Sequence, residues 1–371
     1  MNTRALRTIT LVVFSMAVFV IERPALADDA EGPKIHYKDG FYIDTSDGKN
    51  TLHIQGRLQS RFTFSALDDA KDTDTFAVQR GELRFEGNVF SKQFKYGFET
   101  SFSTRAAAAT TGVGLLNDYY FDWQGSDAVC IKAGQFKVPY LLSEQVSAMK
   151  QEFPDRSLTH DYFTFGRDLG VDLHGALFNY FVNYNLFVMN GDGQNTVNTN
   201  KGFLLGARID VPLFGAYTLT ESDVDYSEEK NLLVGLAYVY DERGAAFENA
   251  SILANVKASH GTADVAFRSH GFSLQGAGMV SRTHEAPTFM NWGYNVQSGY
   301  FFIPKHFEIA ARAAGAVLRN GIPNQYEYGT ALNYYFNKHN LKLQTDYALI
   351  KNARGTGLTD HRVRTQLTVV F

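Results

Sequence analysis

Basic side chains recur along the first half of the sequence at spacings that suit the binding and passage of anions. Arginine offers planar, bidentate, permanently charged donors, whereas lysine offers a mobile point charge, and both can replace the water around a phosphate. Arg57 and Arg61 are four residues apart, which is roughly 13 Å along a strand at about 3.3 Å per residue. Donors spaced in this way predict a path along which an anion moves from one weak binding site to the next. We predict that the anion-binding, pore-lining residues are Arg57, Arg61, Arg80, Arg84, Lys95, Lys132, Lys137, Arg156 and Arg167.

Carboxylates share the same polar positions, which leaves a second interpretation open. Glu82, Glu86 and Glu99 alternate with the arginines, so pairing across strands could neutralise many of these cations. Arg156 and Arg167 could likewise fix a long connector in place instead of contacting an anion. The aspartates available for this are Asp155, Asp161 and Asp168.

The segments that carry these residues alternate between apolar and polar positions. In residues 51–64, Leu52 and Ile54 fall on one face, and Arg57 and Arg61 fall on the other. A period of two over this length predicts a strand with one apolar and one wet face. The pattern recurs in an even number of segments, as in bacterial single-chain barrels. We therefore predict an all-β fold, a sixteen-stranded antiparallel transmembrane β-barrel, with strands at 51–64, 76–90, 94–105, 115–124, 128–138, 168–177, 180–190, 202–213, 232–241, 262–269, 272–283, 290–302, 307–318, 326–336, 341–351 and 361–371.

Long and short connections alternate along this series, as expected for the outer loops and inner turns of a barrel. One exception is 214–231, which is long and acidic although it falls at an inner position. The strand register near 242–261 stays open, because residues 249–259 also fit a strand. The connector 139–167 is both apolar and basic, a composition that argues against disorder. It is predicted to be the third extracellular loop, folded inward as the constriction of the barrel.

The N-terminus predicts export. Residues 1–27 combine a positively charged start, a thirteen-residue apolar stretch and a small-residue cleavage site at Ala25-Leu26-Ala27, which is the pattern of a signal peptide. The apolar stretch is shorter than the roughly 20 residues that a membrane-spanning helix needs. A polar N-terminal lead-in is expected at 28–50, followed by the transmembrane barrel at 51–371.

The charge balance restricts where positive charge can act. Removal of residues 1–27 takes three arginines and one glutamate from 35 basic and 39 acidic residues, which leaves a net charge of −6. An anion channel must therefore concentrate its cations in the pore. Cys130 is the single cysteine, so it forms no intramolecular disulfide. The ten histidines lack metal-ligand spacing, and we expect no metal, cofactor or nucleic acid to bind.

The chain ends in an amphipathic segment with an aromatic last residue. Thr365, Leu367, Val369 and Phe371 share one face of the final predicted strand. Such an ending looks like the signal that barrel-insertion machinery uses, and Phe371 is its candidate contact.

Six motifs, spaced along the chain in a fixed order, carry a resemblance to a known family. They are Gln79–Gly87 (QRGELRFEG), Leu116–Trp123 (LNDYYFDW), Ala133–Tyr140 (AGQFKVPY), Phe153–Ser157 (FPDRS), Gly166–Val171 (GRDLGV) and Phe187–Gly193 (FVMNGDG). With these motifs, about residues 40–371 resemble the phosphate-selective porin O and P family. The resemblance implies a sixteen-stranded trimeric porin whose third loop folds inward, with arginines and lysines along an anion path. One departure is Arg80-Gly81, where the family commonly has two arginines.

The predicted function is passive diffusion of small anions, with phosphate or polyphosphate favoured, through a homotrimer in the lipid of the bacterial outer membrane. The alternatives are a weakly selective general diffusion porin of the same fold, a soluble β-protein, and an outer-membrane barrel hydrolase. The hydrolase would rely on adjacent pairs such as His160-Asp161 and Asp360-His361. Neighbouring residues on a strand face opposite ways, so adjacency does not aim both at one substrate. We therefore predict no enzymatic activity.

Overall fold

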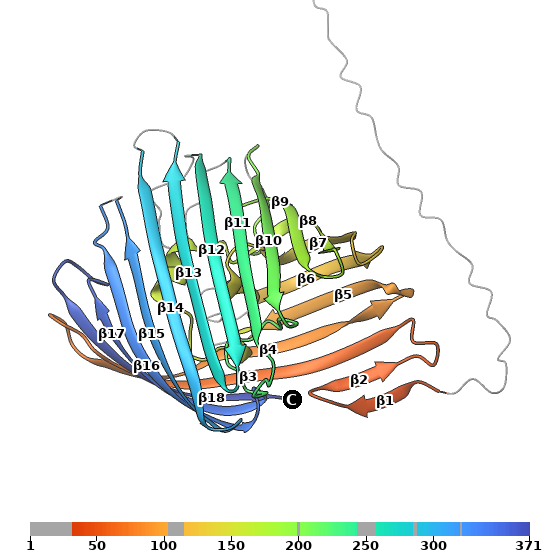
Figure 1. Cartoon of the computed structure of the whole chain (residues 1–371), viewed down its shortest axis with the longest axis horizontal. Coiled ribbons are helices and arrows are strands. Elements are labelled where there is room, and N and C mark those ends of the chain that lie inside the picture. Colours follow the sequence, from red (N-terminus) through yellow and green to blue (C-terminus); the bar gives the residue numbers. More distant parts are fainter. Residues whose placement is uncertain (1–31, 103–114, 199–200, 243–256, 285–287, 320) are drawn as a thin grey trace, which may run out of the picture. The chain divides into compact units, whose positions relative to one another are not determined.

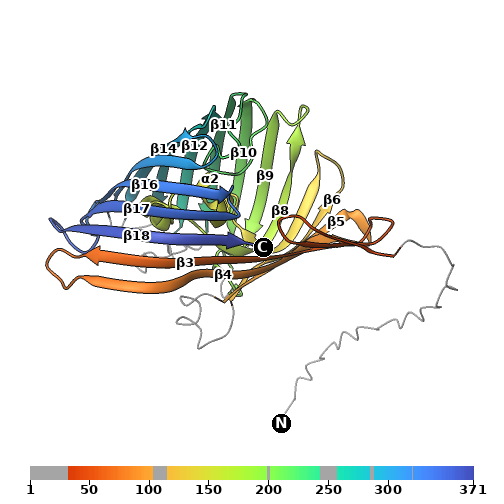
Figure 2. The ribbon, with the colours of Figure 1, turned by 90° about the horizontal axis from the view of Figure 1, so that it is seen from below.

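A closed antiparallel barrel dominates the described part of the chain. The computed structural model describes residues 32–102, 115–198, 201–242, 257–284, 288–319 and 321–371 (Figure 1). Each barrel strand pairs with its neighbour in sequence, and β18 pairs with β3, which closes the sheet (Figure 2). In the described residues the barrel strands are β3 (Thr51–Ala66), β4 (Thr73–Val89), β5 (Ser91–Ser101), β6 (Leu115–Gln124), β7 (Cys130–Lys137), β8 (Arg167–Leu177), β9 (Val182–Met189), β10 (Leu204–Phe214), β11 (Asn231–Asp241), β12 (Ala258–Ser269), β13 (Phe272–Thr283), β14 (Met290–Ile303), β15 (Phe307–Val317), β16 (Gln325–Asn337), β17 (Leu341–Lys351) and β18 (Thr359–Val370).

The predicted sixteen-stranded barrel is confirmed, and the strand bounds agree to within a few residues. β12 begins at Ala258, so the last residues of the open stretch 242–261 belong to this strand. Residues 243–256 of that stretch lie outside the described part of the chain. The predicted strand 94–105 is observed as far as Ser101, and residues 103–105 also lie outside the described part.

The alternation of side chains sets the two faces of the barrel wall. In β17, Lys342, Gln344 and Asp346 are buried, whereas Leu343 and Tyr347 are 39% and 41% exposed. Successive side chains of a strand point to opposite faces, and a transmembrane barrel turns its apolar face to lipid. The polar side chains therefore face the interior, where they can hydrogen-bond to other segments.

Three short helices interrupt the connector between β7 and β8. They are α2 (Leu142–Gln145), the 3-10 helix η1 (Ala148–Lys150) and α3 (Leu158–Phe163). No helix in the described residues is long and apolar enough to cross a membrane.

A hairpin that the sequence analysis did not predict precedes the barrel. β1 (Lys34–Tyr37) and β2 (Phe41–Asp44) pair through a turn at Gly40, whose φ of 139° suits glycine. β2 also pairs with the start of β3, and the rings of Tyr42 and His53 stack with their centroids 4.0 Å apart. The polar lead-in therefore contains ordered strands that extend the sheet beside β3.

Candidate functional site

The connector between β7 and β8, residues 138–166, is held by side chains from strands that are far apart in the barrel. From β17, Lys342 Nζ donates to the Gln151 carbonyl oxygen at 2.6 Å, and from β16, Asn333 Nδ2 donates to the Glu152 carbonyl oxygen at 2.8 Å. These backbone carbonyl groups of the connector therefore accept hydrogen bonds from polar side chains of the barrel strands instead of from water. Further donors to connector carbonyls are Arg208 of β10 and Arg312 of β15.

One connector carboxylate, that of Asp155, receives several arginines. Its oxygens lie 3.0 Å from Arg61 Nη1, 3.3 Å from Arg80 Nη2 and 4.0 Å from Arg364 Nη1. Burial alone would raise the pKa of Asp155, but Arg80, Arg61 and Arg364 hold it well below its usual range. Asp155 is therefore charged and links the connector to β3, β4 and β18.

Aromatic side chains of the connector pack against small inner-face residues. Phe153 forms a buried cluster with Ala310 of β15 and Ala331 of β16. Phe163 is fully buried, and a Cβ added at Gly293 of β14 would lie 2.6 Å from its Cε2 atom. The alanines and this glycine leave the space that the two rings fill, so the position of the connector depends on residues far from it in sequence.

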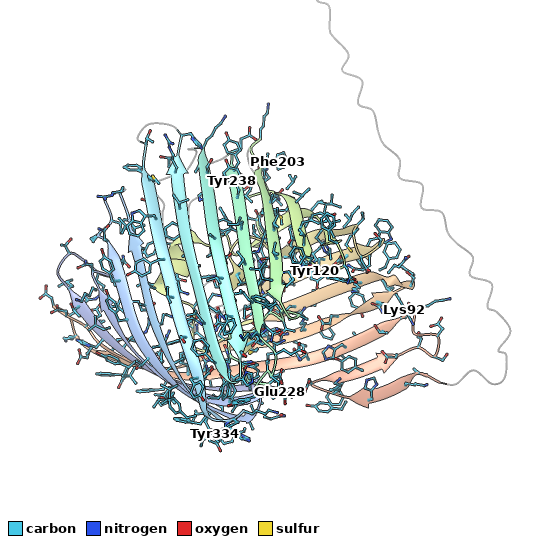
Figure 3. The ribbon with its side chains drawn as sticks, viewed as in Figure 1. Lys92, Tyr120, Phe203, Glu228, Tyr238 and Tyr334 are labelled. Carbon is cyan, nitrogen blue, oxygen red and sulfur yellow. The ribbon has the colours of Figure 1, made fainter. Side chains whose placement is uncertain are left out.

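The long acidic inner segment, residues 215–230, contacts the connector directly. Glu221 N donates to the Lys150 carbonyl oxygen at 3.0 Å, and Glu152 N donates to Glu221 Oε2 at 2.9 Å. Figure 3 shows Glu228 of this segment at the end of β10 and β11 opposite to Phe203. The long acidic connection, which was an exception to the alternation of long and short connections, is thus a folded segment. It contacts the connector from the end of the barrel that carries the short turns. Its most buried residues are Glu221, Ser222 and Asp223.

A cavity of about 390 Å³ lies between the connector and strands β3 to β9. It brings together most of the predicted cations, from the four strands β3, β4, β7 and β8 and from the connector itself. Seven of the nine line it: Arg57, Arg80, Arg84, Lys132, Lys137, Arg156 and Arg167. The carboxylates in the same lining are Glu82, Glu99, Asp118, Glu144 and Asp172.

Many of these cations are paired, as the second interpretation of the sequence anticipated. Arg57 Nη1 lies 3.0 Å from Glu99 Oε2, and Arg84 Nη2 lies 2.7 Å from Glu86 Oε2. Lys132 is more loosely placed. Its Nζ is 3.8 Å from Asp122 Oδ2 and 4.9 Å from the centroid of the Tyr120 ring. Lys137 Nζ donates to the Glu144 carbonyl oxygen at 2.6 Å.

Two of the nine predicted residues do not line this cavity. Arg61 is buried, and its Nε donates to Gln366 Oε1 at 2.8 Å while its Nη1 contacts Asp155. Lys95 is exposed and sits opposite Asp122 in the register of β5 and β6. The alternation along each strand predicts which face of the barrel wall a side chain is on. It does not predict the position along the barrel axis, and these two side chains lie outside the cavity.

Arg156 and Arg167, which could have fixed the connector through aspartates, act in different ways. Arg156 Nε donates to the Ser143 carbonyl oxygen at 2.8 Å and its Nη2 donates to the Val146 carbonyl oxygen at 3.0 Å, so it ties the connector to itself. Arg167 Nε donates to Asp118 Oδ1 at 2.8 Å, from β8 to β6 on the same face of the sheet. Of the three aspartates considered, Asp155 contacts the β-strand arginines Arg61, Arg80 and Arg364.

Several charged residues of the C-terminal strands were missed. A smaller cavity of about 120 Å³ adjoins the connector and includes Asp155, Arg156 and Glu327 in its lining. The same alternation could have found three arginines near the connector, since they fall on the polar face of predicted strands 307–318 and 361–371. The arginines missed near the connector are Arg312, Arg362 and Arg364.

The histidine of the first candidate hydrolytic pair is part of the connector packing. His160 is buried, with Nε2 2.5 Å from Glu144 Oε2 and Nδ1 3.4 Å from Asp161 Oδ1. Burial would lower the pKa of His160, but the hydrogen bonds to Asp161 and Glu144 raise it. Burial would raise the pKa of Glu144, yet Arg156 and His160 hold it well below its usual range. A charged His160–Glu144 pair inside the connector fits a structural role.

The second pair is divided between different partners. Asp360 Oδ2 accepts from Arg354 Nε at 2.8 Å, whereas His361 Nδ1 lies 2.7 Å from the Tyr347 hydroxyl. Among the described residues, no group of three or more His, Cys, Asp or Glu side chains is placed to hold a metal ion.

Comparison with known proteins assigns the family. The family model described as phosphate-selective porin O and P matches residues 52–371. The chain belongs to this family. Its fold is that of outer-membrane channels rather than of an enzyme class, and the protein is an outer-membrane porin. No curated protein sequence matches the chain significantly.

Solved porin structures share the fold at low sequence identity. The anion-selective porin from Comamonas acidovorans has 11% identity and a TM-score of 0.59, with 87% of this chain and 100% of that chain covered. The outer membrane channel DcaP of Acinetobacter baumannii has 11% identity and a TM-score of 0.57, covering 88% and 99%. A trimer form of OmpT, an outer membrane protein of Vibrio cholerae, has 9% identity and a TM-score of 0.52, covering 86% and 99%.

Proposed function

We propose that this porin passes small anions passively, with phosphate or polyphosphate as the favoured solute, through the cavity between the connector and β3 to β9. The observation that carries the proposal is the charge of the cavity lining. Seven cationic side chains and five carboxylates line it, an excess of two positive charges in a chain that is net acidic. Clustered cations in a confined, low-dielectric space raise the local concentration of anions.

We propose that the connector is the constriction, as a third extracellular loop folded inward. Support comes from its hydrogen bonds to β3, β10, β15, β16 and β17, which a loop lying outside the barrel could not reach together. The contact with residues 215–230 adds a second protein segment to the same half of the barrel. Solutes would then pass on the side of β3 to β9.

Within the cavity, Lys132 is the first candidate for direct contact with an anion. Its closest carboxylate oxygen is 3.8 Å away, and its side chain is 24% exposed. A lysine that is not locked in a bidentate pair can turn its ammonium group to a passing ion. Arg57 and Arg167 are held by Glu99 and Asp118 at 3.0 and 2.8 Å. They therefore contribute to the electrostatic field in the cavity more than they contact an anion directly.

The extensive pairing favours one second candidate, a weakly selective general diffusion porin. Arginines that are paired with carboxylates attract anions less strongly than free ones do. The two functions differ in whether phosphate binds inside the pore, because general diffusion needs no binding site.

Conductance of the purified protein in a planar bilayer tests the proposal. Under a chloride gradient we expect a reversal potential of the sign for anion selectivity, and a chloride current that falls as phosphate is titrated in. A current unaffected by phosphate would support general diffusion. A cation-selective reversal potential would overturn the anion proposal altogether.

We further propose that the functional unit is a homotrimer in outer-membrane lipid and that Phe371 is read by barrel-insertion machinery. The trimer form of the OmpT structure supports the first point by fold alone. For the second, Phe371 N donates to the Gly56 carbonyl oxygen at 2.9 Å, and a Cβ at Gly56 would lie 2.6 Å from the Phe371 ring. A terminal aromatic that is seated in this way joins β18 to β3 at barrel closure. Cross-linking in isolated outer membranes tests the trimer, and Phe371→Ser should lower the amount of assembled barrel.

A further inference from the structure

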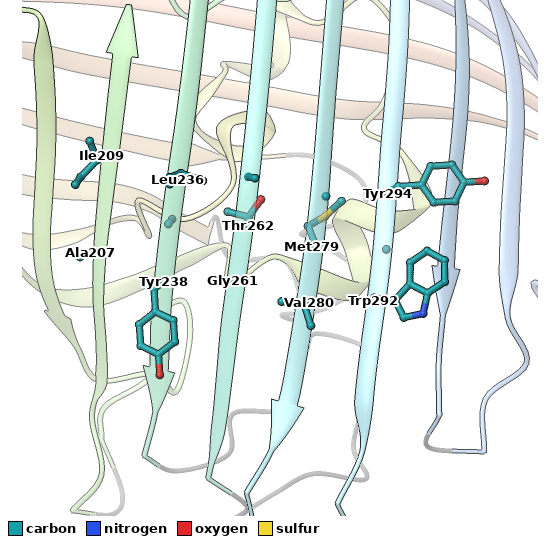
Figure 4. A pocket seen from close by; sticks show the side chains of 14 residues that line it. Ala207, Ile209, Leu236, Tyr238, Gly261, Thr262, Met279, Val280, Trp292 and Tyr294 are labelled. Atoms are coloured by element: carbon teal, nitrogen blue, oxygen red, sulfur yellow. The ribbon is translucent and has the colours of Figure 1, made fainter.

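The outer face of β10 to β14 carries an apolar groove that anion transport does not explain. The cavity has a volume of about 720 Å³ and is lined by residues of five neighbouring strands. Its floor includes Gly261, Ala263 and Gly278, and a Cβ added at Gly278 would meet no heavy atom within 4 Å. Figure 4 shows the larger side chains on either side of this floor. The walls are Ile209, Leu236 and Tyr238 on one side and Val280, Trp292 and Tyr294 on the other.

The groove faces the membrane rather than the channel. Leu236 and Tyr238 are 60% and 54% exposed, whereas Ala237 between them is 7% exposed on the inner face. The exposed face of a transmembrane barrel is in contact with hydrocarbon, so the groove must be filled by an apolar occupant. A neighbouring barrel is convex and would rest on the walls, whereas an extended acyl chain fits between them.

The groove lies toward the outer ends of its strands. Tyr238 is three residues before the end of β11 at Asp241, and Trp292 is the third residue of β14. The other end of β14 leads into the short turn 304–306, and short turns are periplasmic in bacterial barrels. Figure 3 shows Tyr238 toward the same end as Phe203. The groove is therefore at the level of the outer leaflet, which in bacterial outer membranes is built from phosphorylated glycolipid.

Polar and basic groups border the groove at this outer end. Tyr238 Oη lies 2.9 Å from Ser259 Oγ, which in turn lies 2.7 Å from His284 Nε2. Arg282 is exposed and has the same strand parity as Val280, so it follows the groove directly on the outer face. One carboxylate, Glu242, is exposed one residue beyond β11. Basic residues at the depth of lipid phosphates recognise anionic head groups.

We propose that this groove binds an acyl chain of an outer-leaflet phosphorylated glycolipid, with a phosphate of its head group at Arg282. The apolar walls take the chain, and the hydroxyl and imidazole groups of Tyr238, Ser259 and His284 meet the polar head. The site is on the opposite side of the barrel wall from the channel and does not depend on which solute the channel passes.

Native mass spectrometry of the detergent-purified oligomer tests this site. The probe is a bis-phosphorylated, acylated glucosamine disaccharide, compared with phosphatidylglycerol and phosphatidylcholine of matched chain length. Gly278→Leu places a side chain in the groove at a position where a Cβ meets no heavy atom within 4 Å, and Ala311→Leu places the same side chain on the outer face of β15 outside it. Arg282→Gln removes the head-group cation, and Arg319→Gln is its matched control at the outer end of the barrel.

We expect the wild type and the two controls to retain the glycolipid equally, and Gly278→Leu to lower its affinity about tenfold, the loss of roughly one well-buried contact. Arg282→Gln should weaken binding of the glycolipid but not of phosphatidylcholine. Equal retention by Gly278→Leu and wild type would overturn the proposal, as would a wild type that retains no glycolipid. Equal affinity for phosphatidylglycerol would overturn the choice of glycolipid, and dissociation of the oligomer in Gly278→Leu would assign the groove to a subunit interface. Unchanged conductance and heat-modifiable gel mobility establish that each variant is folded.

Discussion

The two halves of the barrel present different inner faces. On β15 to β17 the inner positions include several alanines that are at most 1% exposed, and the connector packs its phenylalanines against them. On β4 to β8 the corresponding positions carry arginines, lysines and carboxylates around a cavity of about 390 Å³. Three of the alanines are Ala310, Ala331 and Ala348.

This difference decides where the chain can fold back on itself. A segment that carries Phe153 and Phe163 gains from burial only where small apolar side chains leave room. The alanines also leave room for the Phe153 ring to stack on Arg312, whose guanidinium carbon is 3.9 Å from the ring centroid. On the proposed function, the connector occupies the half with the small side chains, and solutes pass through the half that carries the cavity.

Replacing Asp155 by asparagine should have the largest effect on this arrangement. The substitution leaves Arg61, Arg80 and Arg364 without their shared carboxylate. Because the Asp155 side chain is 26% exposed, we expect a cost below the roughly 3–5 kcal/mol of a fully buried ion pair. We expect a lower unfolding temperature, higher single-channel conductance and weaker ion selectivity, measured by gel mobility after heating and by bilayer recording. Asp161→Asn is the control, because that carboxylate is 61% exposed. A wild-type conductance in Asp155→Asn would mean that the arginines do not hold the connector.

Overpacking the alanine-rich half should have the next largest effect. In Gly293→Ala the new Cβ would lie 2.6 Å from Phe163 Cε2, whereas in Gly329→Ala it would lie 3.3 Å from the Tyr347 carbonyl oxygen and 3.5 Å from Phe153 Cε1. Overpacking of this kind costs about 1–3 kcal/mol. We expect Gly293→Ala to lower the urea midpoint and to add current noise, and Gly329→Ala to remain close to wild type. Equal midpoints for the two variants would contradict the proposed packing of Phe163 against β14.

The same contrast explains what the sequence could and could not predict. The strands were predictable because the period of two is imposed locally, by lipid on one side and polar groups on the other. That period also placed most candidate cations on the correct face. It carries no information on position along the barrel axis, so it could not separate Lys95 and Arg61 from the seven predicted pore-lining residues that line the cavity.

Nonlocal pairings account for what was missed. Asp155 meets Arg61 and Arg364 across 94 and more residues, and no spacing rule connects them. The acidic segment 215–230 was unexplained because its burial depends on partners in the connector and on β15. The β1–β2 hairpin was missed because its two strands have only four residues each, too short for a clear period.

In the charged half, Lys132→Ala should reduce anion selectivity without loss of stability. Its closest ion pair, at 3.8 Å from Asp122, is partly exposed, and such pairs contribute about 0–1 kcal/mol. We expect the chloride-to-potassium permeability ratio to fall roughly threefold, as the loss of one pore cation implies. Lys95→Ala is the matched control, since Lys95 is exposed outside the cavity. A fall of the same size in both variants would show that the ratio reflects total charge and not the cavity.

The smallest expected effect concerns pH at the contact between the connector and residues 215–230. Burial, together with Glu308 and Glu221, raises the pKa of Glu152 well above its usual value, while Arg312 opposes this rise. A carboxyl group with a raised folded-state pKa contributes stability while it is protonated, and this contribution is lost as the pH rises through that raised pKa. We therefore expect the contact to loosen and current noise to increase as the pH is raised above the ordinary glutamate range.

Glu152→Gln tests this directly, because the amide stays neutral at every pH while keeping the shape of the protonated acid. Its noise should be independent of pH, whereas Glu228→Gln, at an exposed position of the same inner segment, should follow the wild type. A pH dependence that survives in Glu152→Gln would move its origin to the neighbouring carboxylates Glu221 and Glu308. Because Glu308 lies on β15, charge would then still matter in the alanine-rich half, but through the barrel wall and residues 215–230 and not through the connector.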